Sequence, residues 1–494
     1  MRMRRRLLIS AWLGFALAGI FFYPLVVALG SDSFYLQWQQ RDSVEMAVTW
    51  MALAIPLGIA VFHLWGRSTR AAAAAMLAIS VIPLASFAAG FARQLPFDDL
   101  LKGVWESREV AIGVPAGLVL LAGAVFVRAP LSFCRWLRRL LIVLSPVSLV
   151  VLAALITSAS GRSAVTARAR RAPAPVTGET GCAPMLALLF DELSFSYLYD
   201  ADGQIQREFP AIGALANSAV NYTSAEAPSG ETLVSLPALL AARHVRDIRV
   251  EDDRLLELTE DGRLVAFSAT DRDGLFATAK RLGFTTEMAG YYLPYCDLLG
   301  DLVDTCQSLS FYNVSTTDDG FSPANAALTT LVLWPRQFPF GVLKNLAFGP
   351  LQRALVEDTA DFAQRPITAA PPLFRFVHYS VPHLPFVFGP DGYDPPLNPL
   401  RTSPDTGYVR QLQYVDRLVR DAVRAIRDAG LYESSTIVLL SDHGFRFGRR
   451  EQRRLQIPFI AKMPHQHERI DMTAPVQGET LLKRVLEQSC GLYS

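Results

Sequence analysis

The sequence has few charged residues, few cysteines and few histidines for its 494-residue length. Only 19% of the residues are charged, the formal net charge is +1, and no dense basic patch dominates the C-terminal part, so nucleic-acid binding has no support. The five cysteines include no CxxC pair, which disfavours a cysteine-based zinc site. Hydrophobic residues, by contrast, reach 51%, which favours a membrane protein.

Most long apolar runs lie before residue 160, and after that point charge, proline and glycine return at ordinary globular density. A helix needs about 20 apolar residues to cross a bilayer. Five stretches are long enough, which predicts five spans: Leu7–Leu29, Val44–Leu64, Ala71–Ala92, Val110–Val127 and Leu140–Ser158.

Arginine placement predicts the orientation of these spans, because cytoplasmic loops carry an excess of Lys and Arg. The N-terminus and the second and fourth loops are clearly basic, whereas the first and third loops mix signs. Five crossings from a cytoplasmic start place the C-terminal part outside. A cleaved signal peptide is the alternative for the first stretch, and the four stretches that follow disfavour it. The basic residues are Arg2, Arg4, Arg5, Arg6, Arg67, Arg70, Arg128, Arg135, Arg138 and Arg139.

The expected organisation is a five-span transmembrane domain over residues 1–160, a linker over residues 161–182 and a catalytic domain over residues 183–494. The linker is rich in small residues, Arg, Pro and Thr. After it, short apolar runs alternate with a helical pattern whose apolar face includes Leu412, Val415 and Val419. This alternation predicts an α/β sandwich. The expected strands are 183–190, 374–378, 436–441 and 457–462.

Four of the five cysteines fall in the expected exported part. Cys296 and Cys306 flank a short loop, a spacing that suits a local disulfide in an oxidising compartment. Two buried free thiols are the alternative.

Acids and histidines stand at the expected strand ends, where ligands gather in open α/β folds. Asp191-Glu192 follow the first strand, Asp442-His443 follow the strand over 436–441, and His378 ends another strand with His383 just beyond. All are candidate ligands for a divalent metal. Each site alone also fits a helix cap, a turn or a solvated loop. Their convergence at one sheet edge favours a metal centre.

The candidate nucleophile is Thr232, in the segment APSGETLVSLPALL. It follows a turn-forming stretch and opens an apolar helical run, so it could simply cap that helix. The same position suits a nucleophile, because a helix N-terminus and a bound cation both favour an alkoxide.

These features together resemble the sulfatase-like branch of the alkaline phosphatase superfamily. Asp191-Glu192 after a strand, the TxxSxP spacing from Thr232, FxHxxxPHxPF over residues 376–386 and SDHG over residues 441–444 carry the resemblance, which covers roughly residues 184–494. The five-span anchor is similar to that of lipoteichoic acid synthases and lipid A phosphoethanolamine transferases.

The resemblance implies which residues hold the metal. In those transferases a Glu, a Thr nucleophile and an Asp-His pair bind zinc or manganese, and the matching positions here are Glu192, Thr232, Asp442 and His443. Asp191 matches a second acid that sulfatases use. Zinc or manganese is favoured, and calcium, magnesium and a second ion stay open.

The resemblance also implies the remaining site residues. His378 and His383 match the region that holds the phosphate or sulfate group or a second metal. We expect His383 to donate a hydrogen bond to a non-bridging oxygen or to the leaving group.

The expected activity is transfer of a phospholipid head group, phosphoethanolamine or phosphoglycerol, to an envelope glycan or lipid through a phospho-threonine. Sulfatases that use formylglycine need Cys or Ser followed by x-Pro-x-Arg. The segments that begin at Ser235 and at Cys182 both lack the Arg. A hydrolase of sulfate or phosphate esters is the first alternative, and a non-catalytic envelope-assembly protein is the second.

The expected location is a bacterial inner membrane, with the catalytic domain periplasmic or extracellular, and the oligomeric state stays open. The apolar, aromatic segment 330–348 includes Trp334 and Phe338. We expect it to lie against the membrane and help admit lipid. Packing against the sheet or the helical anchor is the alternative.

Overall fold

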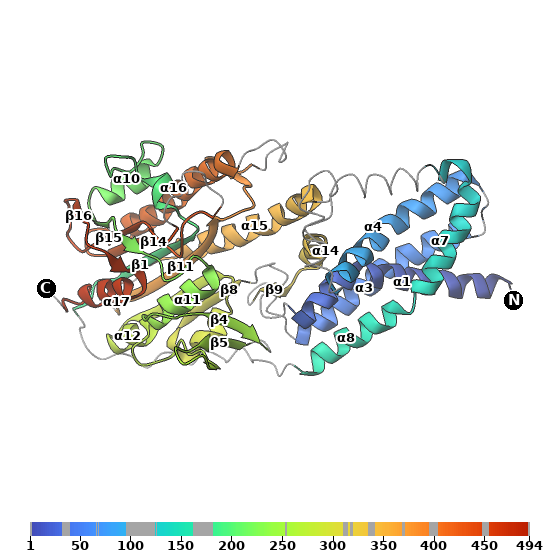
Figure 1. The fold of residues 1–494 in the computed structure, drawn as a ribbon, viewed down its shortest axis with the longest axis horizontal. Helices are drawn as coiled ribbons and strands as arrows, with labels where there is room; N and C mark the ends of the chain where they lie inside the picture. The colour runs from blue at the N-terminus through green and yellow to red at the C-terminus, as the bar shows by residue number, and fades with distance from the viewer. Residues whose placement is uncertain are drawn as a thin grey trace. The chain divides into compact units, whose positions relative to one another are not determined.

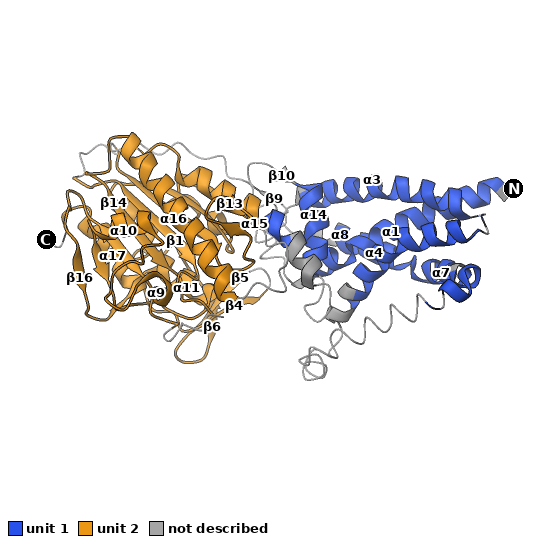
Figure 2. Ribbon diagram, turned by 90° about the horizontal axis from the view of Figure 1, so that it is seen from above, with its two compact units in different colours: residues 1–166, 319–351 blue, residues 167–318, 352–494 orange. Residues whose placement is uncertain are grey.

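The protein is described by a computed structural model. The described residues are 2–31, 40–65, 67, 69–94, 124, 126–161, 181–251, 254–309, 315–316, 320–333, 341–367, 371–394, 404–446 and 454–492. The chain divides into two compact units (Figure 2). The first comprises Met1–Thr166 and Asp319–Leu351, and the second comprises Ala167–Asp318 and Gln352–Ser494. The expected linker lies outside the described residues except at its ends.

The first unit is mainly helical (Figure 1). Its helices are α1 (Arg2–Ser31), α3 (Gln40–Trp65), α4 (Arg70–Gln94), α7 (Pro130–Leu144), α8 (Val147–Gly161) and α14 (Pro323–Val332), and α15 (Gly341–Ala363) crosses the boundary between the units. Within the described residues, four segments are long and apolar enough to cross a membrane: Met3–Ala28, Asp42–Trp65, Arg70–Ala88 and Pro130–Leu155.

The first three expected spans coincide with α1, α3 and α4. Of the expected span Val110–Val127, all but residues 124, 126 and 127 lie outside the described residues. The expected span Leu140–Ser158 begins earlier in the structure, within α7, and a break before α8 interrupts it at Pro146, which has no amide hydrogen to donate.

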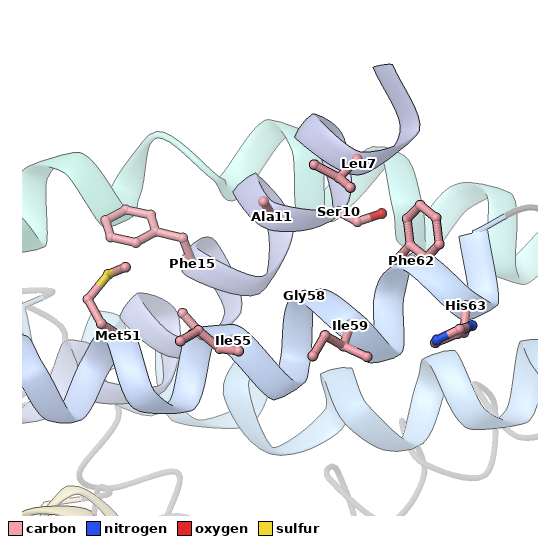
Figure 3. A pocket seen from close by; sticks show the side chains of 11 residues that line it. Leu7, Ser10, Ala11, Phe15, Met51, Ile55, Gly58, Ile59, Phe62 and His63 are labelled. Carbon is pink, nitrogen blue, oxygen red and sulfur yellow. The ribbon is translucent and has the colours of Figure 1, made fainter. Parts of the chain in front are cut away.

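Small residues let α1 and α3 pack closely. A Cβ on Gly14 would lie 2.4 Å from the backbone nitrogen of Gly58. The same two helices line a pocket of about 390 Å³ whose walls, apart from Ser10 and His63, are apolar (Figure 3). α14 also contacts α1 and α3, but it shares only residues 330–332 with the apolar segment 330–348, so both readings of that segment stay predictions. Trp334 and Phe338 lie outside the described residues.

The second unit contains a mixed sheet whose strands have the order β9-β8-β7-β11-β1-β14-β15-β2-β16. The five neighbours from β8 to β14 are parallel, whereas β15 runs antiparallel to both β14 and β2. The central strands are β1 (Met185–Asp191), β7 (Thr285–Tyr291), β8 (Thr305–Leu309), β11 (Leu373–Pro382) and β14 (Thr436–Ser441). The outer strands are β2 (Val220–Tyr222), β9 (Ser315–Thr316), β15 (Phe459–Lys462) and β16 (Ile470–Met472), whereas the short strand β10 (Gly320–Phe321) falls within the residues of the first unit.

All four expected strands are present, and the expected α/β class is confirmed as a mixed sheet with helices on it. Leu186, Leu188 and Phe190 of β1 join a core with residues of α16 (Pro404–Asp428). Because alternate residues of a strand point to the same face of the sheet, these three side chains bury one face of β1 under that helix. The remaining helices of this unit are α9 (Phe195–Leu198), α10 (Pro210–Ala216), α11 (Thr232–Ala241), α12 (Leu275–Arg281), α13 (Tyr295–Leu299), α17 (Gly478–Gln488) and the 3₁₀ turn η1 (Gly300–Leu302).

Small sheets complete the unit: β4 (Ile248–Glu251), β5 (Arg254–Leu258) and β6 (Leu264–Ala266) form one, β12 (Phe388–Gly389) pairs with β13 (Gly392–Tyr393), and β3 (Ala225–Glu226) pairs with β17 (Val476–Gln477).

Two disulfides occur in the second unit. The expected bond between Cys296 and Cys306 is present. A second bond joins Cys182 to Cys490 across 308 residues of sequence, a pairing that the sequence did not indicate. It ties the two ends of the unit together, and the Ala183 amide donates to the Ser489 carbonyl beside it, at 2.8 Å.

Candidate metal centre

The centre lies at the carboxyl ends of β1, β11 and β14, where the sheet brings the expected acids and histidines together. Phe190 pairs with Ser441, and a bulge after Phe190 shifts Asp191 opposite Pro382. Asp442 follows Ser441 directly. Because neighbouring parallel strands end at one edge, residues 191 and 442 meet although 250 residues separate them.

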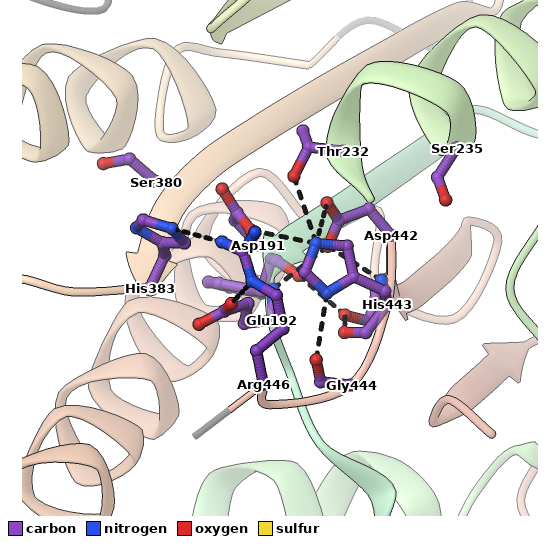
Figure 4. Close-up of polar contacts among 12 residues, drawn as sticks. Asp191, Glu192, Thr232, Ser235, Ser380, His383, Asp442, His443, Gly444 and Arg446 are labelled. Atoms are coloured by element: carbon purple, nitrogen blue, oxygen red, sulfur yellow. Dashed lines mark hydrogen bonds and ion pairs between the residues drawn. The ribbon is translucent and has the colours of Figure 1, made fainter. Parts of the chain in front are cut away.

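Asp191, Asp442 and His443 form a compact cluster, with one potential ligand atom from each within 4.8 Å of the others. The Thr232 hydroxyl faces this cluster, and its oxygen lies 3.2 Å from His443 Nε2 (Figure 4). All four side chains are buried. Four of the residues expected to surround one cation therefore lie together.

The tautomer of His443 follows from its backbone contact. Nδ1 lies 2.9 Å from the carbonyl oxygen of Gly444, which can only accept, so Nδ1 carries the hydrogen. Nε2 then presents its lone pair to the cluster. A hydrogen bond from the other ring nitrogen to a backbone carbonyl is a common way of orienting a metal-binding histidine.

Two buried carboxylate oxygens in the cluster have no hydrogen-bond partner in the described part of the chain: Asp191 Oδ1 and Asp442 Oδ2. They lie 3.9 Å and 3.4 Å from His443 Nε2. An unpartnered buried carboxylate is costly unless a cation or a hydrogen bond compensates it. The two oxygens, the imidazole lone pair and the Thr232 hydroxyl therefore fit a divalent metal ion.

The pKa values of the two acids move in opposite directions. Burial raises the pKa of Asp191 well above its usual range, and the neighbouring Asp442 and Glu192 carboxylates raise it further. Burial would also raise the pKa of Asp442, but His443, His378 and the Glu192 amide lower it below its ordinary value. The Glu192 amide donates to Asp442 Oδ1 at 3.0 Å. Asp442 is thus held as the charged acid of the pair.

Thr232 is the first residue of α11, and Glu231 occupies the N-cap position without capping the helix through its side chain. The alternative that Thr232 serves only as the cap is therefore wrong. Ser235, one turn later, donates its hydroxyl to the Ser229 carbonyl at 2.9 Å and accepts from the Ser229 amide. Ser235 shapes the loop before the helix, while the Thr232 hydroxyl points at the cluster (Figure 4).

Glu192 lies beside the cluster, not within it. Its φ of 66° is unusual for a residue with a side chain, and the Tyr408 hydroxyl holds the Glu192 carbonyl at 2.5 Å. Glu192 Oε1 forms an ion pair with Arg446, while Oε2 has no partner among the described residues. Of the two neighbouring acids that the sequence offered as ligands, Asp191 therefore joins Asp442 and His443 in the cluster.

His383 contacts the same arginine. Its Nε2 lies 2.8 Å from Arg446 Nη2, and its Nδ1 lies 2.6 Å from the Leu384 carbonyl oxygen. A guanidinium can only donate, so Nε2 accepts and Nδ1 carries the hydrogen. Burial lowers the pKa of His383, which agrees with the neutral ring. Arg446 was missed by the sequence reasoning, although it stands two residues after the SDHG motif.

His378 is fully buried in β11, and its Nδ1 lies 2.7 Å from the hydroxyl of Tyr295. Burial lowers the pKa of His378 to about 4, so the ring is neutral near pH 7. The Asp442 carboxylate acts to raise the pKa of His378, which places His378 at the edge of the centre. Nothing in the sequence indicated Tyr295.

Comparison with known proteins assigns the class. The sequence profile of the Sulfatase family matches residues 184–478, more than half of the chain. This fold and this acid–histidine centre define an enzyme of the alkaline phosphatase-like superfamily, whose members are hydrolases and transferases. The chain belongs to the Sulfatase family.

Solved structures with detectable similarity are distant in sequence. Ps i-CgsB in complex with k-i-k-neocarrahexaose is 15% identical, with a TM-score of 0.44 over 63% of this chain and 73% of that one. BT1596, a 2-O GAG sulfatase, is 13% identical, with a TM-score of 0.40 over 63% and 71%. The phosphonate monoester hydrolase of Agrobacterium radiobacter is 14% identical, with a TM-score of 0.40 over 63% and 74%. No curated protein sequence gave a significant match.

Proposed function

We propose that the protein is a membrane-anchored, metal-dependent phosphotransferase that moves a phospholipid head group, of phosphoethanolamine or phosphoglycerol type, to an envelope acceptor. The observation that carries the proposal is the position of the Thr232 hydroxyl, 3.2 Å from His443 Nε2 and beside two unpartnered carboxylate oxygens. The formylglycine route of sulfatases requires Cys or Ser at the nucleophile position. A threonine there favours phosphoryl transfer through its own hydroxyl.

Asp191, Asp442, His443 and Thr232 would hold the cation, for which zinc or manganese is our first choice. When bound, a divalent ion stabilises the threonine alkoxide and neutralises charge on the group being transferred. Glu192 orients Asp442 through its amide and pairs with Arg446. Although burial opposes the charge, Glu192 holds the pKa of Arg446 above its ordinary value, so the guanidinium stays a cation that can contact a phosphate oxygen.

The reaction balances in two steps. The Thr232 oxygen forms a bond to phosphorus as the bond from phosphorus to the diacylglycerol oxygen breaks, and the threonine proton ends on diacylglycerol. An acceptor hydroxyl then attacks the phospho-threonine, takes the head group and returns a proton to Thr232. In water the acceptor would be a water molecule, and the same steps would give hydrolysis.

The first unit supports action at a bilayer. Its long apolar helices are candidates for a membrane anchor, and the loops rich in arginine favour export of the second unit. Two disulfides suit an oxidising compartment outside the cytoplasm. We therefore propose a bacterial inner-membrane location with a periplasmic or extracellular catalytic unit, a lipid donor and an envelope glycan or lipid acceptor.

The experiment uses full-length protein in detergent, with zinc or manganese and phosphatidylethanolamine labelled in its head group. We expect diacylglycerol and a phosphorylated peptide that contains Thr232. Thr232→Ala should lose both products and stay folded without metal, while its stabilisation by metal becomes smaller because one ligand oxygen is lost. Thr232→Ser should retain part of the activity, because it keeps a hydroxyl at the same place.

Two other results would redirect the proposal. Release of sulfate, or of phosphate from a soluble ester, without diacylglycerol would favour the ester hydrolase. Failure to bind any divalent metal would favour a non-catalytic envelope protein.

A further inference from the structure

Tyr295 is a buried residue of the second unit that the proposed reaction does not use. It begins α13, in the connection between β7 and β8, and both its side chain and that of His378 are fully buried. Tyr295 Oη lies 2.7 Å from His378 Nδ1. This is the only hydrogen bond of either side chain in the described part of the chain.

The direction of this hydrogen bond fixes the tautomer of His378. If Nδ1 carried the hydrogen and donated, the Tyr295 proton and the Nε2 lone pair would both be buried without a partner among the described residues. If Tyr295 donates, only the Nε2 hydrogen is left without one. Because each buried, unsatisfied polar group is costly, Tyr295 donates and His378 carries its hydrogen on Nε2.

Several contacts hold Tyr295 in place. Its amide lies 3.1 Å from the Ser308 hydroxyl, and the next residue, Cys296, is bonded to Cys306 in β8. On the other side, a Cβ on Gly290 would lie 2.8 Å from His378 Cβ and 2.9 Å from Tyr295 Cε2. The glycine therefore permits the close approach of the two rings.

Two histidines of the site, His443 and His378, thus present opposite hydrogen-bonding functions. His443, with its hydrogen on Nδ1, offers a lone pair at Nε2, whereas His378 offers an N–H at Nε2. We propose that Tyr295 is a positioning residue that holds His378 as a neutral hydrogen-bond donor to the group being transferred and prevents it from serving as a metal ligand through Nε2. This inference rests on the proposed transfer at Thr232.

A double-mutant cycle on the full-length protein tests this role. Tyr295→Phe keeps the ring and removes the hydroxyl, so the tautomer bias is lost. The net free energy of one hydrogen bond holds about nine-tenths of His378 in the Nε2–H form, and without it that fraction falls to about one-half. We therefore expect kcat for head-group transfer to fall about twofold, with KM unchanged. Metal content should stay the same. His378→Gln supplies an amide N–H in place of Nε2–H that needs no tautomer, so adding Tyr295→Phe to it should cost nothing further.

Tyr379→Phe is the matched control, because Tyr379 is an equally buried tyrosine in β11 that stacks on Phe190 instead. It should leave kcat and metal content unchanged. An equal loss from Tyr295→Phe in the wild-type and His378→Gln backgrounds would reveal a merely structural role and overturn the inference. An unchanged kcat in Tyr295→Phe, or a metal ion bound to His378 in the wild-type protein, would overturn it as well. If the wild-type protein forms no phospho-Thr232, the proposed function fails first.

Discussion

Replacing Asp191 by Asn should change stability in opposite directions with and without metal. The ligand oxygens of Asp191 and Asp442 lie within 4.8 Å of each other. At an effective dielectric constant of about 20, two charges at that separation would repel by roughly 3 kcal/mol. This figure is an upper bound, because the raised pKa of Asp191 lets the pair relieve the repulsion by binding a proton. In metal-free protein, Asp191→Asn should therefore raise the free energy of unfolding by up to about 3 kcal/mol.

With metal bound, the same substitution removes a ligand. Loss of even a supporting residue of a metal site costs about 10- to 100-fold in affinity, and a ligand should cost at least that. A 100-fold weaker site forfeits about 3 kcal/mol of metal-dependent stability. Asp191→Asn should therefore raise the free energy of unfolding without metal and lower its stabilisation by metal, by a similar amount in each case.

Thermal unfolding of the full-length protein in detergent measures both effects, after chelator treatment and again with zinc or manganese. Asp202→Asn, at an exposed turn, is the matched control and should shift neither midpoint. A lower midpoint for Asp191→Asn in chelator, together with an undiminished shift on adding metal, would refute the reasoning.

Two further perturbations follow from the contacts of the second unit. Arg446→Met leaves Glu192 buried without its ion-pair partner. Because the arginine is itself partly exposed, the free energy of unfolding measured with denaturant should fall by about 2 kcal/mol, less than for a fully buried pair. Adding Glu192→Gln should restore it. Replacing Cys182 and Cys490 together by Ala should lower the free energy of unfolding by about 4 kcal/mol, because the bond closes a very long loop. If reductant leaves the free energy of unfolding of the wild-type protein unchanged, this prediction is contradicted.

The sheet and the core of the site could be predicted because their signals are local. A short apolar run followed at once by an acid or a histidine marks both the strand and its catalytic end, as in Leu189–Asp191 and Leu440–Asp442. The sheet then brings such ends together without further information. The antiparallel direction of β15 is not marked in this way, because an apolar run of four residues reads the same in either direction.

The contacts around the core could not be predicted because they join distant residues through side-chain geometry. Arg446 reaches His383 over 63 positions, Tyr295 reaches His378 over 83, and Cys182 reaches Cys490 over 308. Motif spacing likewise placed Glu192 among the metal ligands, and its backbone conformation instead turns the side chain to Arg446. The role expected for His383, a hydrogen-bond donor to the substrate, stays a prediction. In the structure its Nε2 accepts from Arg446.

Anomalous diffraction from crystals of the full-length protein grown with zinc or manganese tests the central claim most directly. We expect one strong peak within about 2.0–2.3 Å of Asp191, Asp442 and His443 ligand atoms and of the Thr232 oxygen. A peak between Glu192 and His383, or none near residue 232, would contradict the account.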